Sequence, residues 1–174
     1  IYSGTITITS GKDALHSEYD EDLSVGYIYI AGGELNISAA DDAIRGTTIV
    51  QIDSGVINIE TCTEGIESTY IQVNGGTITI YATDDAINAT VKSSYYEVAV
   101  EINGGYIDLT VGSGDTDAVD SNGNLYINGG TIFISASSSF DVNGLIDFTD
   151  GDVTVNGQAM INIVASQPGG GGGG

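Results

Sequence analysis

The strongest constraint on the fold is a repeated motif: two runs of alternating apolar residues joined at a glycine hinge, then a small residue and an acidic pair. It reads YIYIAGGELNISAADDAI at Tyr27–Ile44, IQVNGGTITIYATDDAI at Ile71–Ile87 and, more weakly, VQIDSGVINIETCTEGI at Val50–Ile66. The hinge glycines follow one another at steps of 29, 22, 21, 29, 25 and 21 residues: Gly4, Gly33, Gly55, Gly76, Gly105, Gly130 and Gly151. A repeat of this length predicts a solenoid, in which each turn covers the open face of the next.

Within each repeat the apolar residues alternate with polar ones, which predicts strands that bury one face. Two such strands flank each hinge, and the residues expected to point inward form columns of Ile, Val, Leu and Phe. Before the hinge these are Ile28, Ile30, Val50, Ile52, Ile71, Val73, Val100, Ile102, Leu125, Ile127, Ile146 and Phe148. After it they are Ile6, Ile8, Leu35, Ile37, Ile57, Ile59, Ile78, Ile80, Ile107, Leu109, Ile132, Ile134, Val153 and Val155.

Two further columns complete each repeat. Small residues follow the second strand and indicate a tight inward corner: Ser10, Ala39, Thr61, Ala82, Val111, Ala136 and Gly157. Apolar residues after the corner predict a third short strand: Leu15, Ile44, Ile66, Ile87, Val119 and Val142. We therefore expect an all-β fold, a right-handed parallel β-helix with about seven turns of ~21 residues and loop insertions.

The repeats set the domain boundaries. Residues 1–165 are expected to form the β-helix domain, which we take to be part of a longer protein, and the Gly-rich residues 166–174 a flexible tail or linker. Three insertions interrupt the period, at His16–Gly26, Val91–Val100 and Gly112–Asp120. In a solenoid such loops project from one edge, where they are either sites of function or solvated bulges.

The charge balance limits the partners. The chain has 24 acidic and 3 basic residues, a formal net charge of −21. Nucleic acids and anionic membranes bind through Lys and Arg, so both are poor partners, and no apolar stretch is long enough for membrane insertion. Cations are the expected partners.

The acidic residues that follow the small corner residue of each repeat are the candidate ligand-binding groups. At one offset the repeats place Asp13, Asp42, Glu64, Asp85 and, after an insertion, Asp117; the flanking acids are Asp41, Asp84, Asp115 and Asp120. Two bare carboxylates about 5 Å apart repel by about 0.8 kcal/mol in bulk water and about 3 kcal/mol at an effective dielectric of 20. A stacked column of acids therefore requires neutralisation.

Two explanations of this column remain open. Ca²⁺ takes six to eight oxygen ligands in flexible geometry, which carboxylates from successive turns and nearby carbonyls can supply. Alternatively, each acid caps its own turn by accepting backbone N–H bonds. Zn²⁺ is a poor candidate, because Cys62 and His16 are the chain's only soft or imidazole ligands and lie far apart in the repeat.

The repeated GG-x-I-x-I-x-A-x-D-D-A-I pattern, with an acidic insertion and a Gly-rich end, resembles the polysaccharide-lyase-like β-helix family of carbohydrate-binding domain-containing proteins. The resemblance covers Gly4–Ile87 well and Val100–Val142 loosely. It implies an extracellular or cell-surface, calcium-associated protein that binds polysaccharide such as cellulose or pectin. It transfers the Ca²⁺ site to Asp41, Asp42, Asp84 and Asp85.

Outward-facing aromatic rings provide a separate argument for sugar binding. Tyrosine rings stack on pyranose faces, and the candidates are Tyr29, Tyr81, Tyr106 and Tyr126. The competing interpretation is that Thr and Tyr are simply good strand formers on a hydrated face. Two N-glycosylation triplets begin at Asn36 and Asn88, the second at an expected turn.

The sequence also bears on two functions other than non-catalytic binding. A calcium-dependent lyase needs a base beside the uronate, but the basic side chains are Lys12, Arg45, Lys92 and His16, of which Lys12 and Arg45 sit beside the acidic corners, where they neutralise repulsion. The main alternative is structural: unpaired strand edges at the end of a β-helix promote stacking of subunits into an extracellular fibre, with Ca²⁺ relieving the repulsion between copies.

Overall fold

The computed structural model describes residues 1–114 and 116–165. All regular secondary structure in these residues is β, in three sheets. Sheet A contains β1 (Thr5–Ser10), β4 (Glu34–Ala39), β7 (Val56–Thr61), β10 (Thr77–Ala82), β13 (Tyr106–Val111), β16 (Thr131–Ser135), β19 (Asp152–Val155) and β20 (Gln158–Met160). Sheet B contains β2 (Leu15–Ser17), β5 (Ile44–Gly46), β8 (Ile66–Ser68), β11 (Ile87–Ala89), β14 (Asp117–Ser121) and β17 (Ser138–Val142). Sheet C contains β3 (Ile28–Ile30), β6 (Ile49–Ile52), β9 (Tyr70–Val73), β12 (Ala99–Ile102), β15 (Asn124–Ile127) and β18 (Ile146–Phe148).

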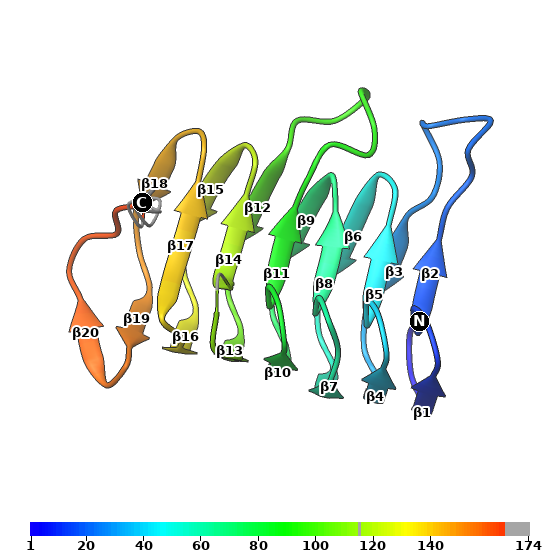
Figure 1. Ribbon diagram of the computed structural model, residues 1–174, viewed down its shortest axis with the longest axis horizontal. Helices are drawn as coiled ribbons and strands as arrows, with labels where there is room; N and C mark the ends of the chain where they lie inside the picture. Colours follow the sequence, from blue (N-terminus) through cyan, green and yellow to red (C-terminus); the bar gives the residue numbers. More distant parts are fainter. Residues whose placement is uncertain (115, 166–174) are drawn as a thin grey trace, which may run out of the picture.

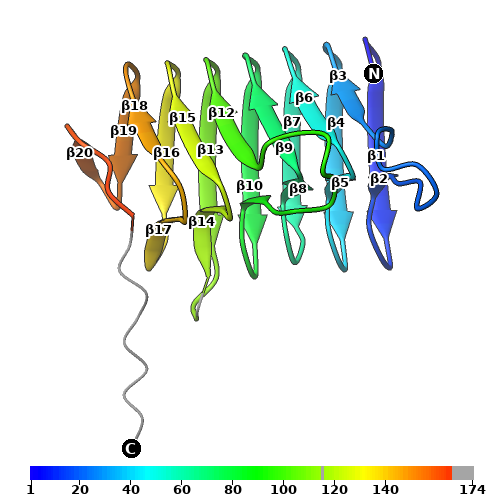
Figure 2. The ribbon, with the colours of Figure 1, turned by 90° about the horizontal axis from the view of Figure 1, so that it is seen from above.

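The chain visits the sheets in a fixed order. From β1 to β18 it passes from sheet A to sheet B to sheet C and back, so each strand pairs with the third strand before and after it, always in parallel. Figures 1 and 2 show the resulting stack of similar passes along one axis. This is the order that a repeat with three strands predicts.

The core lies between the three sheets and consists of the predicted columns. Ile28, Val50, Ile71, Val100, Leu125 and Ile146 are neighbours in register across sheet C. The same is true of Ile6, Leu35, Ile57, Ile78, Ile107, Ile132 and Val153 across sheet A. These residues are buried in the middle of the stack and partly buried toward its ends. Stacking of like side chains therefore fixes the strand register.

The hinge glycines permit close contact between passes. Gly76 has a φ of 97°, a backbone conformation that other residues rarely adopt. A Cβ on Gly76 would lie 2.9 Å from the carbonyl oxygen of Gly55, the hinge glycine of the preceding pass. The glycine is therefore required both by its backbone conformation and by the space available.

An asparagine ladder, which the sequence motif did not reveal, joins the passes just before this hinge. The Asn74 amide donates to Asp53 Oδ1 (2.7 Å), Asn103 to Asn74 Oδ1 (2.8 Å) and Asn128 to Asn103 Oδ1 (2.9 Å). The Thr149 hydroxyl donates to Asn128 Oδ1 (3.0 Å). Each rung satisfies a side chain on the neighbouring pass, so the ladder reinforces the backbone pairing.

Two of the predicted columns contain an error of position. A bulge in β7 pairs Ser38 with Thr61 directly after Ile37 with Ile59, so Glu60 is extra. Thr61, predicted to fill the inward corner, is consequently exposed, whereas Cys62 is buried with 3% of its surface accessible. In β17, Val119 pairs with Phe140, not Val142, because only two residues separate β16 from β17.

The end of the described stack differs from a seventh turn. β19 is followed by β20, which pairs antiparallel with it. The turn has Asn156 at φ 49° and Gly157 at φ 81°, the two positive values of a tight two-residue hairpin. The stack thus has six passes through all three sheets, closed on sheet A by a hairpin.

The insertions fall in two different connections. Residues 18–27 and 90–98 both lengthen the connection from sheet B to sheet C, which is only two residues long between β5 and β6. Both loops project from the same edge of the molecule (Figure 1). The third insertion lies between β13 and β14, on the connection from sheet A to sheet B.

Candidate functional site

The acidic corner residues form one column along the molecule. Backbone hydrogen bonds set their alignment: Ala14 N–H donates to Asp42 O (2.9 Å), Ala43 N–H to Glu64 O (2.9 Å), Gly65 N–H to Asp85 O (3.0 Å) and Ala86 N–H to Asp117 O (3.1 Å). We call the residues so aligned the corner column: Asp13, Asp42, Glu64, Asp85 and Asp117. The predicted offset is therefore the one that the fold uses.

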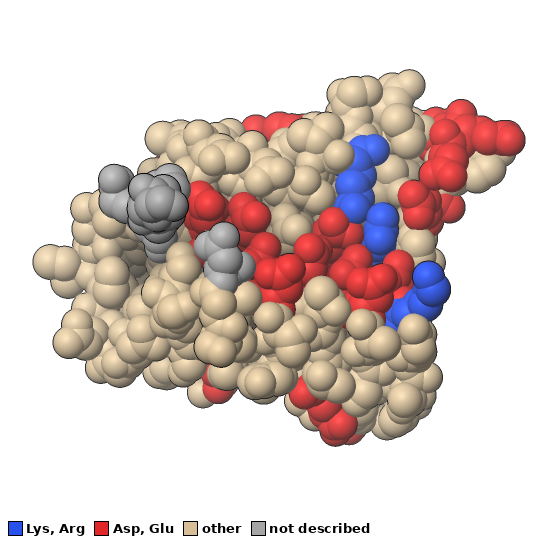
Figure 3. All heavy atoms as spheres, in the orientation of Figure 1, with Lys and Arg blue, Asp and Glu red and all other residues tan. Residues whose placement is uncertain are grey.

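A second column of polar side chains lies immediately beyond the first, in the strands of sheet B. Its members are the residues that follow the inward-facing apolar residue of each strand, and they are neighbours in register. This strand column consists of His16, Arg45, Glu67, Asn88, Asp120 and Asp141. Figure 3 shows Asp and Glu side chains gathered in a band across this face, with Lys and Arg only at its N-terminal end.

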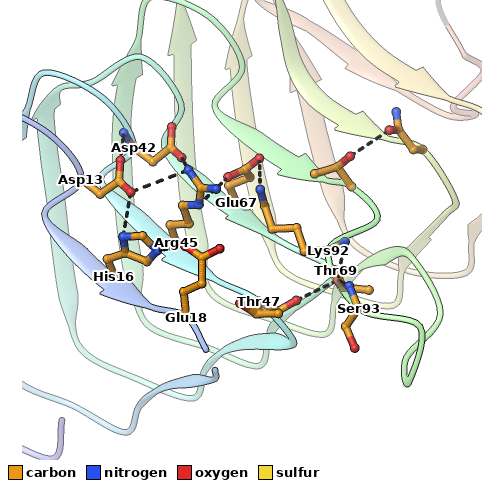
Figure 4. A network of polar contacts seen from close by, with 12 residues as sticks. Asp13, His16, Glu18, Asp42, Arg45, Thr47, Glu67, Thr69, Lys92 and Ser93 are labelled. Carbon is orange, nitrogen blue, oxygen red and sulfur yellow. Dashed lines mark hydrogen bonds and ion pairs between the residues drawn. The ribbon is translucent and has the colours of Figure 1, made fainter. Parts of the chain in front are cut away.

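Basic groups neutralise that N-terminal end. Arg45 lies 3.5 Å from Asp42, 3.7 Å from Asp13 and 3.4 Å from Glu67 (Figure 4). Lys92, brought by the second insertion, lies 2.7 Å from Glu67. The His16 ring nitrogens lie 2.9 Å from Asp13 and 2.8 Å from Glu18. The interpretation of Arg45 as a neutralising residue is confirmed by these distances.

Carboxylates at this end also approach one another closely enough to share a cation. Single ligand oxygens of Asp13, Asp41 and Asp42 all lie within 4.8 Å of one another, as do those of Asp42, Glu64 and Glu67. Glu64 Oε2 is buried and has no hydrogen-bond partner among the described residues. Glu67 Oε2 is likewise buried without a hydrogen-bond partner there, although it lies 3.4 Å from Arg45 Nε, so this second group contains two such oxygens.

Burial and the nearby negative charges raise the pKa of several of these carboxyl groups. Burial, followed by the neighbouring Glu67 and Glu64, raises the pKa of Asp42 to about 8. Burial is also the main cause for Glu64, whose pKa rises to about 7. Both values mean that the folded protein holds negative charge here at a cost in free energy.

The C-terminal half of the band has no basic residue to offset it, because no Lys or Arg follows Lys92 in the sequence. Burial, with the charges of Asp120, Asp84 and Asp117, raises the pKa of Asp85 to about 7. Burial and the charges of Asp141, Asp117 and Asp84 raise the pKa of Asp120 to about 6. The candidate ligand Asp115 lies outside the described residues.

Some hydrogen bonds support the capping explanation, but they join successive passes and do not lie within one turn. Asp42 N–H donates to Asp13 Oδ1 at 3.2 Å, and Asp117 N–H donates to Asp85 Oδ1 at 2.8 Å. The Ser138 hydroxyl donates to Asp117 Oδ1. Some oxygens of the corner column therefore cap the next pass, while the second oxygen of Asp13 pairs with His16 and Arg45.

The four predicted sugar-binding tyrosines do not share one surface. Tyr29 and Tyr126 lie on sheet C, on β3 and β15, with three strands between them. Tyr81 and Tyr106 lie on neighbouring strands of sheet A, and each is 45% exposed. Tyr106 packs at 5.4 Å from the Phe133 ring. A single flat platform made by all four is absent from the described fold.

The two glycosylation triplets differ in accessibility. Asn36 lies on β4 and its amide donates to Glu34 Oε1 at 3.1 Å. Asn88, expected at a turn, lies within β11 and is buried between Glu67 and Asp120, because the apolar residue before it begins a strand. Its Oδ1 atom is buried and has no hydrogen-bond partner among the residues described.

Sequence reasoning missed the strand column as a set. The corner column was visible because its acids recur at one offset, whereas the strand column mixes His, Arg, Glu, Asn and Asp. The available signal was the alternation within the third strand, in which the residue after the buried Ile must point outward. Glu67, for example, follows Ile66 directly.

Comparison with known proteins supports the coarser part of the resemblance seen in the repeats, which is the carbohydrate-binding domain-containing family and not its polysaccharide-lyase-like subtype. A sequence profile of the family described as "Carbohydrate-binding domain-containing protein" matches residues 1–116 of the chain's 174, which is more than half. No curated protein and no solved structure matches the chain. Among the described residues no helix is long and apolar enough to span a membrane. The chain therefore belongs to the family of carbohydrate-binding domain-containing proteins.

Proposed function

We propose that this protein is a non-catalytic, calcium-associated polysaccharide-binding domain that works outside the cell or on its surface. The observation that carries the proposal is the family match over residues 1–116, which spans both insertions on the B-to-C edge and the N-terminal half of the acidic band. The polysaccharide is a plant-type glycan such as cellulose or pectin, as the resemblance of the repeats to the polysaccharide-lyase-like subtype implies.

The proposed architecture is a right-handed parallel β-helix. It is supported by the three-sheet order, in which every third strand is a parallel neighbour, and by columns of like side chains in register. Parallel crossovers between strands of one sheet are nearly always right-handed. Such a rod presents long, regular faces, which suits a polymeric ligand.

The acidic band is the proposed Ca²⁺-binding face. The donor set is all oxygen, the preference of Ca²⁺, and the Asp42, Glu64 and Glu67 group supplies three carboxylates with two buried oxygens that have no hydrogen-bond partner among the described residues. Asp13 and Asp41, and on the C-terminal side Asp84, Asp85, Asp117 and Asp120, are the other proposed ligands. A bound Ca²⁺ would offset their mutual repulsion and could bridge them to an acidic sugar.

The basic residues support binding over catalysis. A lyase needs a free base beside the uronate carboxylate. Arg45 is held among Asp42, Asp13 and Glu67, and Lys92 by Glu67. Ion pairing of this kind stabilises the protonated form of a side chain, which opposes its use as a base.

Affinity electrophoresis tests the proposal. The protein should be retarded in gels that contain a soluble β-glucan or polygalacturonate when Ca²⁺ is present, and release no unsaturated sugar from polygalacturonate. Retardation by polygalacturonate should disappear in EGTA if Ca²⁺ forms the bridge. Absence of binding to every polysaccharide, with and without Ca²⁺, would contradict the proposal, and unsaturated product would replace it with a lyase.

A further inference from the structure

A pocket of about 230 Å³ lies between the two insertions on the B-to-C edge, above β3 and β6. Three tyrosines contribute to its lining: Tyr27, Tyr29 and Tyr96. Polar atoms come from Ser24, Thr48 and Gln51, and the remaining lining residues are isoleucines. Its volume is below the roughly 300–1,000 Å³ of sites for drug-sized ligands, so it suits one sugar ring better than a long oligosaccharide.

The walls of the pocket are held by contacts between distant parts of the chain. Ser93 Oγ in the second insertion donates to the carbonyl oxygen of Leu23 in the first, at 2.6 Å. Ser93 N–H donates to Thr69 Oγ1 at 2.9 Å, and the Thr69 hydroxyl donates to Thr47 O at 2.8 Å (Figure 4). The two loops are thereby anchored to each other and to the short connections between them.

The base of the pocket is fixed by one carboxylate. Asp53 accepts from the Tyr29 hydroxyl at 2.6 Å and from the Gln51 amide at 2.8 Å. Asn74, the next residue of the asparagine ladder, donates to the same carboxylate at 2.7 Å. The edge of the Tyr2 ring packs against Tyr29 at 5.9 Å between centroids. The polar and aromatic groups are therefore oriented before any ligand arrives, which lowers the entropic cost of binding.

We infer that this pocket binds a neutral pyranose unit of the polysaccharide; the inference rests on the proposed function and assigns its sugar site. The rings of Tyr27 and Tyr96 are 66% and 42% exposed, which leaves aromatic surface at the pocket for a sugar face to cover. The Tyr29 and Ser24 hydroxyls donate their protons to Asp53 and Asp22, so their oxygens can accept from sugar hydroxyls, and the Gln51 amide has a second N–H to donate.

The charge of the lining selects the sugar. No Lys, Arg, Asp or Glu is among the described residues that line the pocket, and the chain around it carries a net charge of −21. A uronate would bury its carboxylate without a cationic partner and against this field. Neutral hexose units should therefore bind here, while acidic sugars depend on the acidic band and its Ca²⁺.

Isothermal titration calorimetry with a glucose hexamer in β-1,4 linkage tests the inference, using the whole protein in Ca²⁺. Tyr27→Ala and Tyr96→Ala should each weaken binding about tenfold, the loss expected for one stacked ring with its buried area. Tyr96→Phe should keep most of the affinity. Tyr95→Ala is the matched control, because the Tyr95 side chain is 67% exposed on the same loop as Tyr96 but is not part of the pocket lining. A galacturonate hexamer should show no dependence on Tyr96.

The outcomes separate the pocket from the proposed function. Binding of polysaccharide that is unchanged in both pocket variants, or is lost in Tyr95→Ala instead, would overturn the pocket assignment and leave the family function intact. Failure of the wild-type protein to bind any glycan would overturn both. Circular dichroism melts of each variant identify losses that come from unfolding.

Discussion

At the scale of residues, the acidic band brings many carboxylates together, and Lys and Arg side chains neutralise them only at its N-terminal end. Arg45 contacts carboxylates from three successive passes, Asp13, Asp42 and Glu67, and Lys92 adds a second cation. No Lys or Arg follows Lys92 in the sequence, and burial together with the charges of other acids raises the pKa of Asp85 and Asp120. The two ends should therefore respond differently when a charge is removed.

Arg45→Gln should destabilise the protein by about 1–3 kcal/mol, because it leaves three partly buried carboxylates without their shared cation. The lower part of the range reflects the 29% exposure of the Arg45 side chain. Urea unfolding followed by circular dichroism measures the loss. Lys12→Gln, at an exposed position, is the control. Equal stability of the two variants would show that Arg45 does not hold this end together.

In the absence of metal, stability should fall as pH rises from 5 to 8. The pKa of Asp42 is raised from 3.8 to about 8, that of Asp85 from 3.8 to about 7 and that of Glu64 from 4.5 to about 7. Between these limits the folded chain binds protons that the unfolded chain has released, so the stabilisation is complete below about pH 4 and is lost above the folded pKa. Melting temperatures in EGTA at pH 5 and pH 8 check this, and a higher value at pH 8 would contradict it.

At the level of single residues, the position of an acid is easier to predict from the sequence when acids recur at the same offset in the other repeats. Asp13, Asp42, Glu64, Asp85 and Asp117 occupy one offset and do stack. Thr61 does not occupy its predicted inward corner, because the bulge that adds Glu60 shifts the alternation by one position and buries Cys62 instead, and no residue type marks a bulge in advance. Burial accordingly raises the pKa of the Cys62 thiol to about 12.

At the scale of elements, strand register is fixed by two kinds of stacking. The apolar columns inside were predictable, since the alternation of Ile and Val has period two. The asparagine ladder outside was not recognised, although Asn74, Asn103 and Asn128 each precede a glycine pair. A side chain that bonds to its counterpart one pass away becomes visible only when the passes are aligned.

Asn103→Ala should destabilise the protein by about 1–2 kcal/mol, because it removes two rungs of the ladder and leaves Asn74 Oδ1 without its donor. Chemical denaturation measures the effect. Asn36→Ala is a suitable control, since the Asn36 amide bonds to Glu34 on its own strand. Similar losses in the two variants would mean that the ladder adds no coupling between passes.

At the scale of the whole molecule, the hairpin formed by β19 and β20 bears on the fibre alternative. β20 pairs antiparallel along the edge of sheet A that a further parallel strand would otherwise occupy. Asn156-Gly157, a strong hairpin signal, could have predicted it from sequence. Covering an edge in this way disfavours end-to-end stacking of copies at that end.

Sedimentation velocity should accordingly give a single monomeric species, with or without Ca²⁺, across a wide range of protein concentration. The reason is that sheet A offers no parallel edge on the side of β20. Growth of large particles on addition of Ca²⁺ would favour the fibre over the polysaccharide binder. Deletion of residues 156–165 tests whether the hairpin is what limits association.

The most direct test of the account is thermal unfolding after EGTA treatment, repeated with Ca²⁺ or Mg²⁺ restored. Ca²⁺ at 100 times its dissociation constant stabilises a folded protein by about 2.7 kcal/mol, which corresponds to roughly 5–10 °C for a chain of this size. The account predicts a rise of this order with Ca²⁺ and a much smaller one with Mg²⁺, since the carboxylate groups suit a large, flexible coordination shell. An unchanged melting temperature with Ca²⁺ would contradict it and leave the acids as caps between passes and solvated charge.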